Sequence, residues 1–284
     1  MVGAIAVLGT LDTKGTEVAY LSHLIRSHGS ETIIIDTGLL DYPAVRADIT
    51  RQEVARAAGH DLAVLLSAKN KGAAISAMIE GTGRLLQQMS ADGRVIGAIA
   101  VGGGQGTAIG ATAMQALPLG IPKLMVSTIA SGQNRFDPYV GTTDMCLMHS
   151  VADIAGINLI TRQIFANAAA AIAAMAKVGG APVRGRPRAI GTTMLGLTTT
   201  CATMAREYLE SWDFEVVTFH PNGAGGRCLE RLLNEDVLQG VLDVSLQELT
   251  GYVCHGLFDA GPDRLVAAGK RGLPQVIVPG GIDY

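Results

Sequence analysis

The sequence predicts an α/β protein made of two Rossmann-like lobes, each with a doubly wound, mostly parallel sheet. Short, wholly apolar runs such as 4–8 and 95–101 are typical of strands that are buried on both faces of a parallel sheet. These runs alternate with segments of helical periodicity, and the alternation starts again after a segment rich in Gly, Pro and Arg. We therefore expect a first lobe over 1–178, a linker over 179–187 and a second lobe over 188–284.

Composition narrows the class of protein. Hydrophobic residues make up 48% and charged residues 17% of the 284 residues, which suits a buried core and argues against disorder. The formal net charge is −3 with no basic run, so nucleic acid is not an expected partner. The four cysteines have no CxxC spacing and are expected to be free thiols. No signal peptide and no membrane span is expected, which predicts a cytoplasmic protein.

The first lobe can be followed element by element. Its strands are expected at 4–8, 32–36, 95–101 and 122–126, with helices after the first and third of them. The capping-box pattern Thr50-x-x-Glu53 starts a short helix, and 62–66 suits a strand or a helix. The helix over 72–89 is weakened by two glycines, Gly81 and Gly83. A loop is expected over 134–144 and a helix over about 151–177.

The second lobe repeats the alternation in a shorter form. Strands are expected at 188–192, 215–219, 241–244 and 275–278, and helices at 198–211, 227–233 and 263–270. The strand entries Gly120-Ile-Pro-Lys123 and Gly272-Leu-Pro-Gln275 echo each other, which suggests two related lobes. Because the chain stops just after a strand that a helix would be expected to cover, we expect it to be a fragment of a longer protein.

The loop Gly102–Thr107 is the first candidate for binding. It joins an apolar strand to a helix and exposes backbone N–H groups at a helix N-terminus, a site that favours phosphate. It is not a dinucleotide fingerprint, because Thr107 stands at the third glycine position, and no Walker Lys-Ser/Thr follows. The structural alternative is a tight turn. Two glycines would serve that turn, so four favour binding, with the Thr107 hydroxyl capping the helix.

The loop Gly9–Lys14 is the second candidate and follows the first strand. Lys14 would neutralise phosphate charge, and Asp12 would hold a magnesium ion or a hydroxyl. The structural alternative is that Asp12 or Thr13 is a helix N-cap. In an open α/β sheet this loop and Gly102–Thr107 lie at the carboxyl ends of strands and can share one crevice.

Further polar residues are expected around the same crevice. Ser127–Gly132 leaves a strand end, Asp144 is a metal or ribose candidate, and Asp36 ends the second strand where an acid often meets a ribose. A helix cap for Asp144 and an ordinary strand-end role for Asp36 are the alternatives. In the second lobe, Asn222–Arg227 is another glycine-rich junction that could close over the ligand. The expected nucleotide-binding set is Gly9, Thr10, Asp12, Thr13, Lys14, Asp36, Gly102, Gly103, Gly104, Gln105, Gly106, Thr107, Thr128, Ser131, Gly132 and Asp144, with Asp12 and Asp144 as metal ligands.

Four motifs together resemble a known family. They are Ala6-Val-Leu-Gly-Thr-Leu-Asp-Thr-Lys-Gly-Thr-Glu17, Gly102-Gly-Gly-Gln-Gly-Thr107, Ser127-Thr-Ile-Ala-Ser-Gly132 and Ser150-Val-Ala-Asp-Ile-Ala-Gly-Ile-Asn158. They resemble the bacterial and plant family that contains the ATP-binding N-terminal domain of the tomato tobamovirus-resistance protein. The resemblance implies two Rossmann-like lobes, ATP binding mainly by the first lobe, and a homodimer. It does not imply a particular reaction.

Two functions remain open from the sequence. The first is ATP binding, with or without Mg²⁺-dependent hydrolysis or phosphoryl transfer. The second is a non-catalytic two-lobed module that binds a small molecule or effector, since no set of nucleophile and base can be argued from spacing. A nicotinamide enzyme is disfavoured by the missing third glycine.

Overall fold

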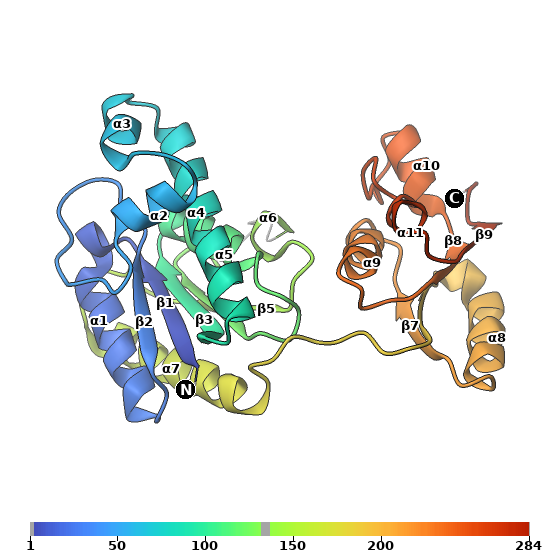
Figure 1. Cartoon of the computed structure of the whole chain (residues 1–284), viewed down its shortest axis with the longest axis horizontal. Helices are drawn as coiled ribbons and strands as arrows, with labels where there is room; N and C mark the ends of the chain where they lie inside the picture. The colour runs from blue at the N-terminus through green and yellow to red at the C-terminus, as the bar shows by residue number, and fades with distance from the viewer. Residues whose placement is uncertain (1–2, 132–136, 284) are drawn as a thin grey trace. The chain divides into compact units, whose positions relative to one another are not determined.

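The computed structural model describes residues 3–131 and 137–283, and it confirms the predicted α/β fold with two parallel sheets (Figure 1). Contacts within the chain divide it into two units, Met1–Pro182 and Val183–Tyr284, here called the first and second lobe. Each lobe has its own sheet and its own helices, and each is described by itself. Gly132, one of the expected site residues, lies outside the described residues.

The sheet of the first lobe has five parallel strands in the order β2-β1-β3-β4-β5. In chain order they are β1 (Ala4–Gly9), β2 (Thr32–Asp36), β3 (Val95–Gly102), β4 (Lys123–Ser127) and β5 (Met145–His149). Every residue of β1 is buried, because helices cover both faces of the sheet. The strand order reverses between β1 and β3, and ligands of open α/β sheets bind at the carboxyl ends of strands at such a switch point.

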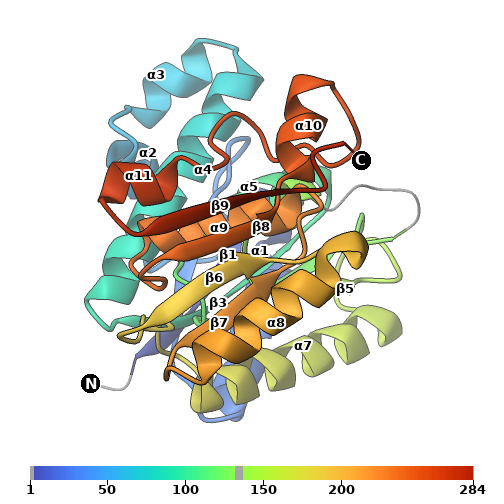
Figure 2. The same ribbon diagram turned by 90° about the vertical axis from the view of Figure 1, so that its right-hand side faces the viewer.

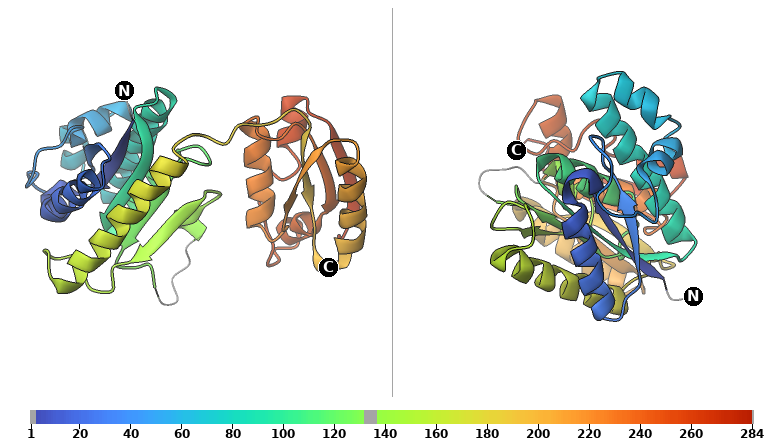
Figure 3. Two further views of the ribbon diagram at one scale, coloured as in Figure 1. Left: turned by 90° about the horizontal axis from the view of Figure 1, so that it is seen from below. Right: turned by 90° about the vertical axis from the view of Figure 1, so that its left-hand side faces the viewer.

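Two layers of helices cover this sheet (Figures 1 and 3). One face carries α1 (Leu11–Ser27) and α7 (Leu159–Val178), whose apolar residues form one core cluster with the sheet. The opposite face carries α2 (Arg51–Ala57), α4 (Lys71–Ala91) and α5 (Gly104–Met114), which form a second cluster. Two short helices complete the lobe, α3 (Leu62–Ser67) and α6 (Asp137–Val140).

The structure departs from the sequence-based elements at four places, each with a local reason. The helix over 72–89 is confirmed as α4, and it continues through Gly81. A Cβ at position 81 would lie 2.0 Å from the carbonyl oxygen of Val54, so the glycine is what lets α4 approach α2 closely. The ambiguous run 62–66 is helical and is capped by Asp61. The strand β5 was not expected. The helix predicted from 151 begins only at Leu159, after the Asn158 cap.

Helix α7 is long and apolar enough to span a membrane by length and composition alone. In this fold one face of it is buried in the core of the first lobe, through residues such as Phe165, Ala168 and Ile172. That is the packing of a core helix in a globular lobe.

The second lobe repeats the strand order of the first with four parallel strands, β7-β6-β8-β9 (Figure 2). They are β6 (Ala189–Thr193), β7 (Glu215–Phe219), β8 (Val241–Ser245) and β9 (Gln275–Gly280). One face carries α8 (Thr199–Glu210), which follows the 3₁₀ turn η1 (Gly196–Thr198), and the other carries α9 (Ala224–Asn234) and α11 (Ala267–Arg271) (Figure 3). The unexpected helix α10 (Gln247–Val253) follows β8, and α11 is shorter than predicted. The similar motifs Gly120–Lys123 and Gly272–Gln275 thus lead into corresponding strands of the two sheets, β4 and β9.

Candidate functional site

The two glycine-containing loops of the first lobe lie around one cavity at the switch point. The cavity has a volume of about 230 Å³ and is closed on a third side by Leu40. The structure brings the two loops together, as their positions after β1 and β3 predict. The other lining residues are Thr10, Asp12, Thr13 and Lys14, at the N-cap and first turn of α1, and Gly103, Gly104, Gln105 and Gly106, at the N-cap and first turn of α5.

The N-terminus of α5 forms the wall after β3. Strand β3 ends at Gly102, and Gly103 is the N-cap residue, with no side-chain cap from the described residues. The N–H of Thr107 is bonded to the carbonyl of Gly103 at 2.8 Å, so the three N–H groups before it, on Gly104, Gln105 and Gly106, have no acceptor inside the helix. A row of open N–H groups at the positive end of a helix dipole attracts anions.

Steric demand distinguishes the four glycines of this loop. A Cβ on Gly102 would lie 2.7 Å from the Cα of Gly106, so the turn requires glycine there. A Cβ on Gly103 or Gly106 would make only ordinary contacts, and one on Gly104 would meet nothing within 4 Å. The tight-turn alternative therefore accounts for Gly102 alone. At Gly104 glycine keeps the space beside the backbone open.

The N-terminus of α1 forms the wall after β1. Thr10 is its N-cap residue without a side-chain cap bond, and the hydroxyls of Thr10 and Thr13 share a hydrogen bond of 2.7 Å. The ammonium of Lys14 donates to the backbone carbonyl of Ile154, and Glu17 accepts from the N–H of Gly156 at 2.7 Å. These two contacts join α1 to the loop before α7, which contains the fourth motif of the sequence.

Asp12 lines the cavity, and its carboxylate is only partly paired. Its Oδ2 accepts from the N–H of Leu40 at 2.7 Å, while its Oδ1 is buried and has no partner in the described part of the chain. A Cβ on Gly38 would lie 2.7 Å from Oδ2, so Gly38 makes room for this carboxylate. Asp12 bonds to the backbone of Leu40 and does not cap α1, so the helix-cap alternative does not describe it.

The ribose role expected for Asp36 is overturned by its burial. Its exposed fraction is 1%, and it does not line the cavity. Its Oδ1 accepts from the N–H of Leu11 at 3.1 Å and of Gly38 at 2.8 Å. Burial raises the pKa of this carboxyl above its ordinary value, although the two backbone hydrogen bonds act to lower it. Asp36 positions the start of α1 and the Gly38 turn.

The metal role expected for Asp144 is also wrong. Asp144 precedes β5 and therefore lies at the amino ends of the strands, whereas the cavity lies at their carboxyl ends. These two edges of a five-residue strand are about 15 Å apart. Its Oδ1 pairs with the buried Nζ of Lys123 at 2.7 Å, and its Oδ2 accepts from the N–H of Gly120 at 2.9 Å. Over the described residues, no three His, Cys, Asp or Glu side chains form a metal-binding group.

The third candidate loop, which begins at Ser127, supports the start of α5, and its described residues do not line the cavity. The Thr107 hydroxyl does not cap α5 as expected; it is buried and bonded to the Ser127 hydroxyl at 2.7 Å, which ties α5 to β4. Thr128 lies beside the glycine loop, since a Cβ on Gly103 would be 3.6 Å from its Oγ1. Ser131 is exposed and does not line the cavity.

Two further cavities adjoin the first and were missed from the sequence. One of about 220 Å³ shares Leu40 and Gln105 with it, and its other lining residues are Leu39, Leu65, Leu66, Lys69, Asn70, Lys71 and Ala74. One of about 450 Å³ shares Leu40 and is lined in addition by charged side chains, among them Arg51, Arg56 and Asp61. Leu40 is 71% exposed at the meeting point of all three. No local sequence pattern points to this region, because the exposure of Leu40 after the buried Gly38 and Leu39 is a property of the folded chain.

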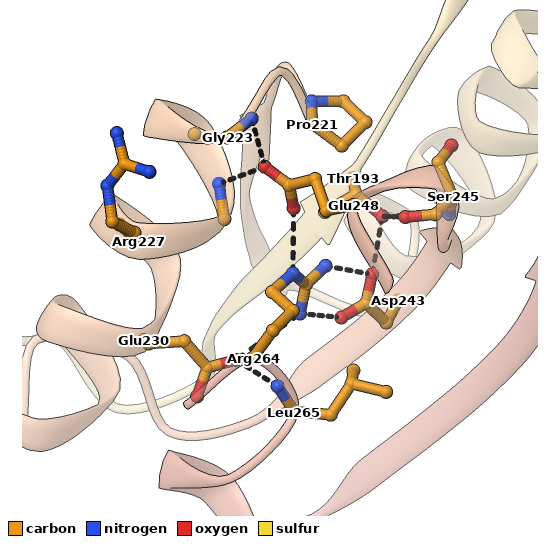
Figure 4. Close-up of polar contacts among 12 residues, drawn as sticks. Thr193, Pro221, Gly223, Arg227, Glu230, Asp243, Ser245, Glu248, Arg264 and Leu265 are labelled. Carbon is orange, nitrogen blue, oxygen red and sulfur yellow. Dashed lines mark hydrogen bonds and ion pairs between the residues drawn. The ribbon is translucent and has the colours of Figure 1, made fainter. Parts of the chain in front are cut away.

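The corresponding edge of the second lobe is filled by a buried ionic cluster (Figure 4). Arg264 pairs through two nitrogens with Asp243, at 2.6 and 2.7 Å, and through Nε with Glu248 at 2.7 Å. Glu230 accepts from the same guanidinium at 3.2 Å. Burial acts to lower the pKa of Arg264, but its hydrogen bonds and charge pairing with Asp243 and Glu248 prevail and raise it.

Glu248 also occupies the N-terminus of α9. Its Oε1 accepts from the N–H of Gly223 at 2.6 Å and from that of Gly226 at 3.0 Å. The glycine-rich junction Asn222–Arg227, expected to close over a ligand, therefore directs these two N–H groups at a carboxylate of its own lobe. The junction before α9 is therefore closed from within. It follows β7, the strand that corresponds to β2, so it is not the counterpart of the junction before α5, which follows β3 and faces a cavity.

Comparison with known proteins places the whole chain in one family. Residues 3–180 match the N-terminal domain, and residues 187–284 the C-terminal domain, of the uncharacterised protein family UPF0261. A UPF0261 protein of Clostridium tetani is 42% identical over 98% of this chain and 69% of its own length. One of Rhizobium meliloti is 41% identical over 98% of this chain and 68% of its own length. The ToMV susceptible protein tm-1(GCR26) of Solanum lycopersicum is 31% identical over 97% of this chain and 39% of its own length.

Proposed function

Since the chain belongs to the uncharacterised protein family UPF0261, we propose its function from the geometry: the first lobe binds ATP in the cavity between Gly9–Lys14 and Gly102–Thr107. The phosphates lie against the N–H groups of Gly104, Gln105 and Gly106, and Lys14 supplies the positive charge. Thr10 and Thr13, whose hydroxyls share a hydrogen bond, lie on the opposite wall.

One observation carries this proposal: the N-termini of α1 and α5 converge on one cavity, and α5 keeps three N–H groups without an acceptor inside the helix. The glycine at 104 is not required by packing, which supports a backbone kept bare for a ligand. At a different junction, the start of α9 in the second lobe, a carboxylate of the chain itself already takes two N–H groups.

The residues present fit a magnesium ion that arrives with the nucleotide. Mg²⁺ is commonly held by one or two carboxylates together with substrate phosphates and water. Asp12 is the acidic residue in the described lining of the cavity, and its buried Oδ1 has a free lone pair to offer. When bound, the metal would neutralise phosphate charge; Asp144 takes no part because it lies at the other edge of the sheet.

The two functions left open by the sequence differ in whether the bound ATP is hydrolysed or transfers a phosphoryl group. Hydrolysis or phosphoryl transfer needs a group that orients the nucleophile. Asp12 lines the cavity and accepts from the N–H of Leu40 through one oxygen, so it is the group to test for that role. Without turnover, the same cavity serves the alternative function, a non-catalytic effector-binding module. Multiple-turnover phosphate release with ATP and Mg²⁺ distinguishes the two.

The binding experiment uses a variant that changes the cavity and leaves the fold alone. Gly104→Ala adds a methyl group to open space at the start of α5 and should lower ATP affinity roughly tenfold or more, because it holds phosphate off the N–H groups. Gly269→Ala is the matched control, a helical glycine of α11 whose Cβ also meets nothing within 4 Å. Calorimetry with ATP, triphosphate and adenosine measures both. Equal affinities of the two variants for ATP would contradict the proposal.

Two properties of the whole protein remain part of the proposal. We place it in the cytoplasm, to which the four free cysteines are suited. We also expect a homodimer, on the resemblance to the family alone.

A further inference from the structure

We propose that the cavity adjoining the phosphate site is a nucleobase subsite, which takes the planar ring of the nucleotide. We call it the leucine slot; its lining residues are Leu39, Leu40, Leu65, Leu66, Lys69, Asn70, Lys71, Ala74 and Gln105. The inference rests on the proposed function, and it adds where the base lies and what recognises it.

Continuity with the phosphate cavity is the first argument. Leu40 and Gln105 line both cavities, so a single ligand can extend from one into the other. The two volumes, about 220 and 230 Å³, together fall within the range of about 300–1,000 Å³ that is usual for small-molecule sites. A ligand that fills both must be anionic at one end and apolar at the other, as a nucleotide is.

The chemistry of the lining is the second argument. Four leucines and Ala74 form the walls of the slot, and these side chains pack well against the faces of a flat heteroaromatic ring. Leu40 and Leu66 are still 71% and 38% exposed, so a bound ring would remove apolar surface from water. The third cavity, with Arg51, Arg56 and Asp61, suits polar groups instead.

Gln105 joins the two subsites. Its backbone N–H belongs to the open first turn of α5, and the residue lines both the phosphate cavity and the slot. A side-chain amide offers both a donor and an acceptor, which suits the polar edge of a base. Asn70 lies on the slot as well, although its Oδ1 already accepts from the N–H of Ala73 at 3.1 Å.

The experiment compares two positions on one helix. Leu66→Gln changes a slot residue, and Val64→Gln is the control on the same helix α3, 65% exposed and not part of the described cavity linings. Calorimetry measures the affinity for ATP and for inorganic triphosphate, which has no base. Leu66→Gln should lower the affinity for ATP about five- to tenfold and leave the affinity for triphosphate unchanged. Val64→Gln should change neither affinity. Leu65→Gln, at a slot residue that lines neither of the other two cavities, should repeat the Leu66→Gln result.

The outcomes separate this inference from the function on which it rests. If Leu66→Gln and Leu65→Gln leave ATP affinity unchanged, or lower the affinities for ATP and triphosphate equally, the base does not lie in the leucine slot. The phosphate site still stands in that case, provided that Gly104→Ala weakens triphosphate. If the unmodified protein binds neither ATP nor triphosphate, the proposed function itself is wrong, and the subsite with it.

Discussion

The ammonium of Lys14 donates a hydrogen bond to the backbone carbonyl of Ile154, and so joins the start of α1 to the loop before α7. A neutral carbonyl holds this cation on the cavity wall without cancelling its charge. The charge of a lysine that pairs with a carboxylate, as Lys123 does with Asp144, is already neutralised within the protein. Lys14 is therefore placed for an anion that comes from outside.

We predict that Lys14→Met lowers the affinity for ATP and for triphosphate roughly tenfold or more, because one charge-assisted contact is lost. Adenosine affinity should stay the same. Lys177→Met is the matched control: Lys177 also donates to a backbone carbonyl, that of His28, at 2.8 Å. Calorimetry of the three ligands measures the effect. A parallel loss for adenosine and ATP would show that Lys14 acts only through the fold.

Asp12→Asn should abolish the effect of Mg²⁺ on ATP affinity. The amide oxygen of asparagine can still accept from the N–H of Leu40, but the carboxylate that would bind the metal is gone. Without Mg²⁺ the variant should bind ATP more tightly than the parent, because a negative charge has left the cavity. Asp48→Asn is the control, since Asp48 accepts from the N–H of Ile34 at 2.8 Å. A Mg²⁺ response that survives in Asp12→Asn would exclude Asp12 as a ligand.

Asp36→Asn should change how stability depends on pH. Burial, partly offset by the hydrogen bonds from Gly38 and Leu11, raises the pKa of Asp36 in the folded state. The contribution of a carboxyl with a raised pKa is fully present below its unfolded value and is lost as pH rises through the folded value. Asparagine cannot ionise and avoids that loss. Urea unfolding between about pH 3 and 7 should show the variant gaining stability relative to the parent as pH rises; a constant difference would contradict the raised pKa.

Arg264→Met should unfold the second lobe and spare the first. The substitution leaves Asp243, Glu230 and Glu248 without their buried cation, and breaking a buried pair typically costs about 3–5 kcal/mol. Arg186→Met is the control, because the pair of Arg186 with Glu215 spans 3.4 Å between exposed side chains. Limited proteolysis read by mass spectrometry assigns the damage to a lobe. Intact resistance of the second lobe in Arg264→Met would mean that the cluster contributes little.

Local patterns were enough to predict the fold and to place the loops after β1 and β3 at one edge of the sheet. The apolar run of β3 and the glycines after it are contiguous, so Gly103–Gly106 could be placed at a helix N-terminus from the sequence alone. The position of Asp144 could not be predicted in this way. The strand β5 reads Met-Cys-Leu-Met-His and lacks the pattern of a buried strand, so the sequence does not show that Asp144 precedes a strand and lies at the opposite edge of the sheet. Leu40 and Leu66 join the site only through tertiary packing, which no local pattern records.

The Glu248 carboxylate acts as a ligand that the second lobe supplies to itself. Because it is tethered within the same fold, its effective concentration at the N-terminus of α9 is far higher than that of a dissolved anion. Arg264 holds it in place from the other side. An anion from solution would have to displace a bound and charge-paired group there, whereas at α5 it would meet open N–H groups. The start of α9 therefore offers no second open site, and the stoichiometry to expect in a titration is one nucleotide per chain.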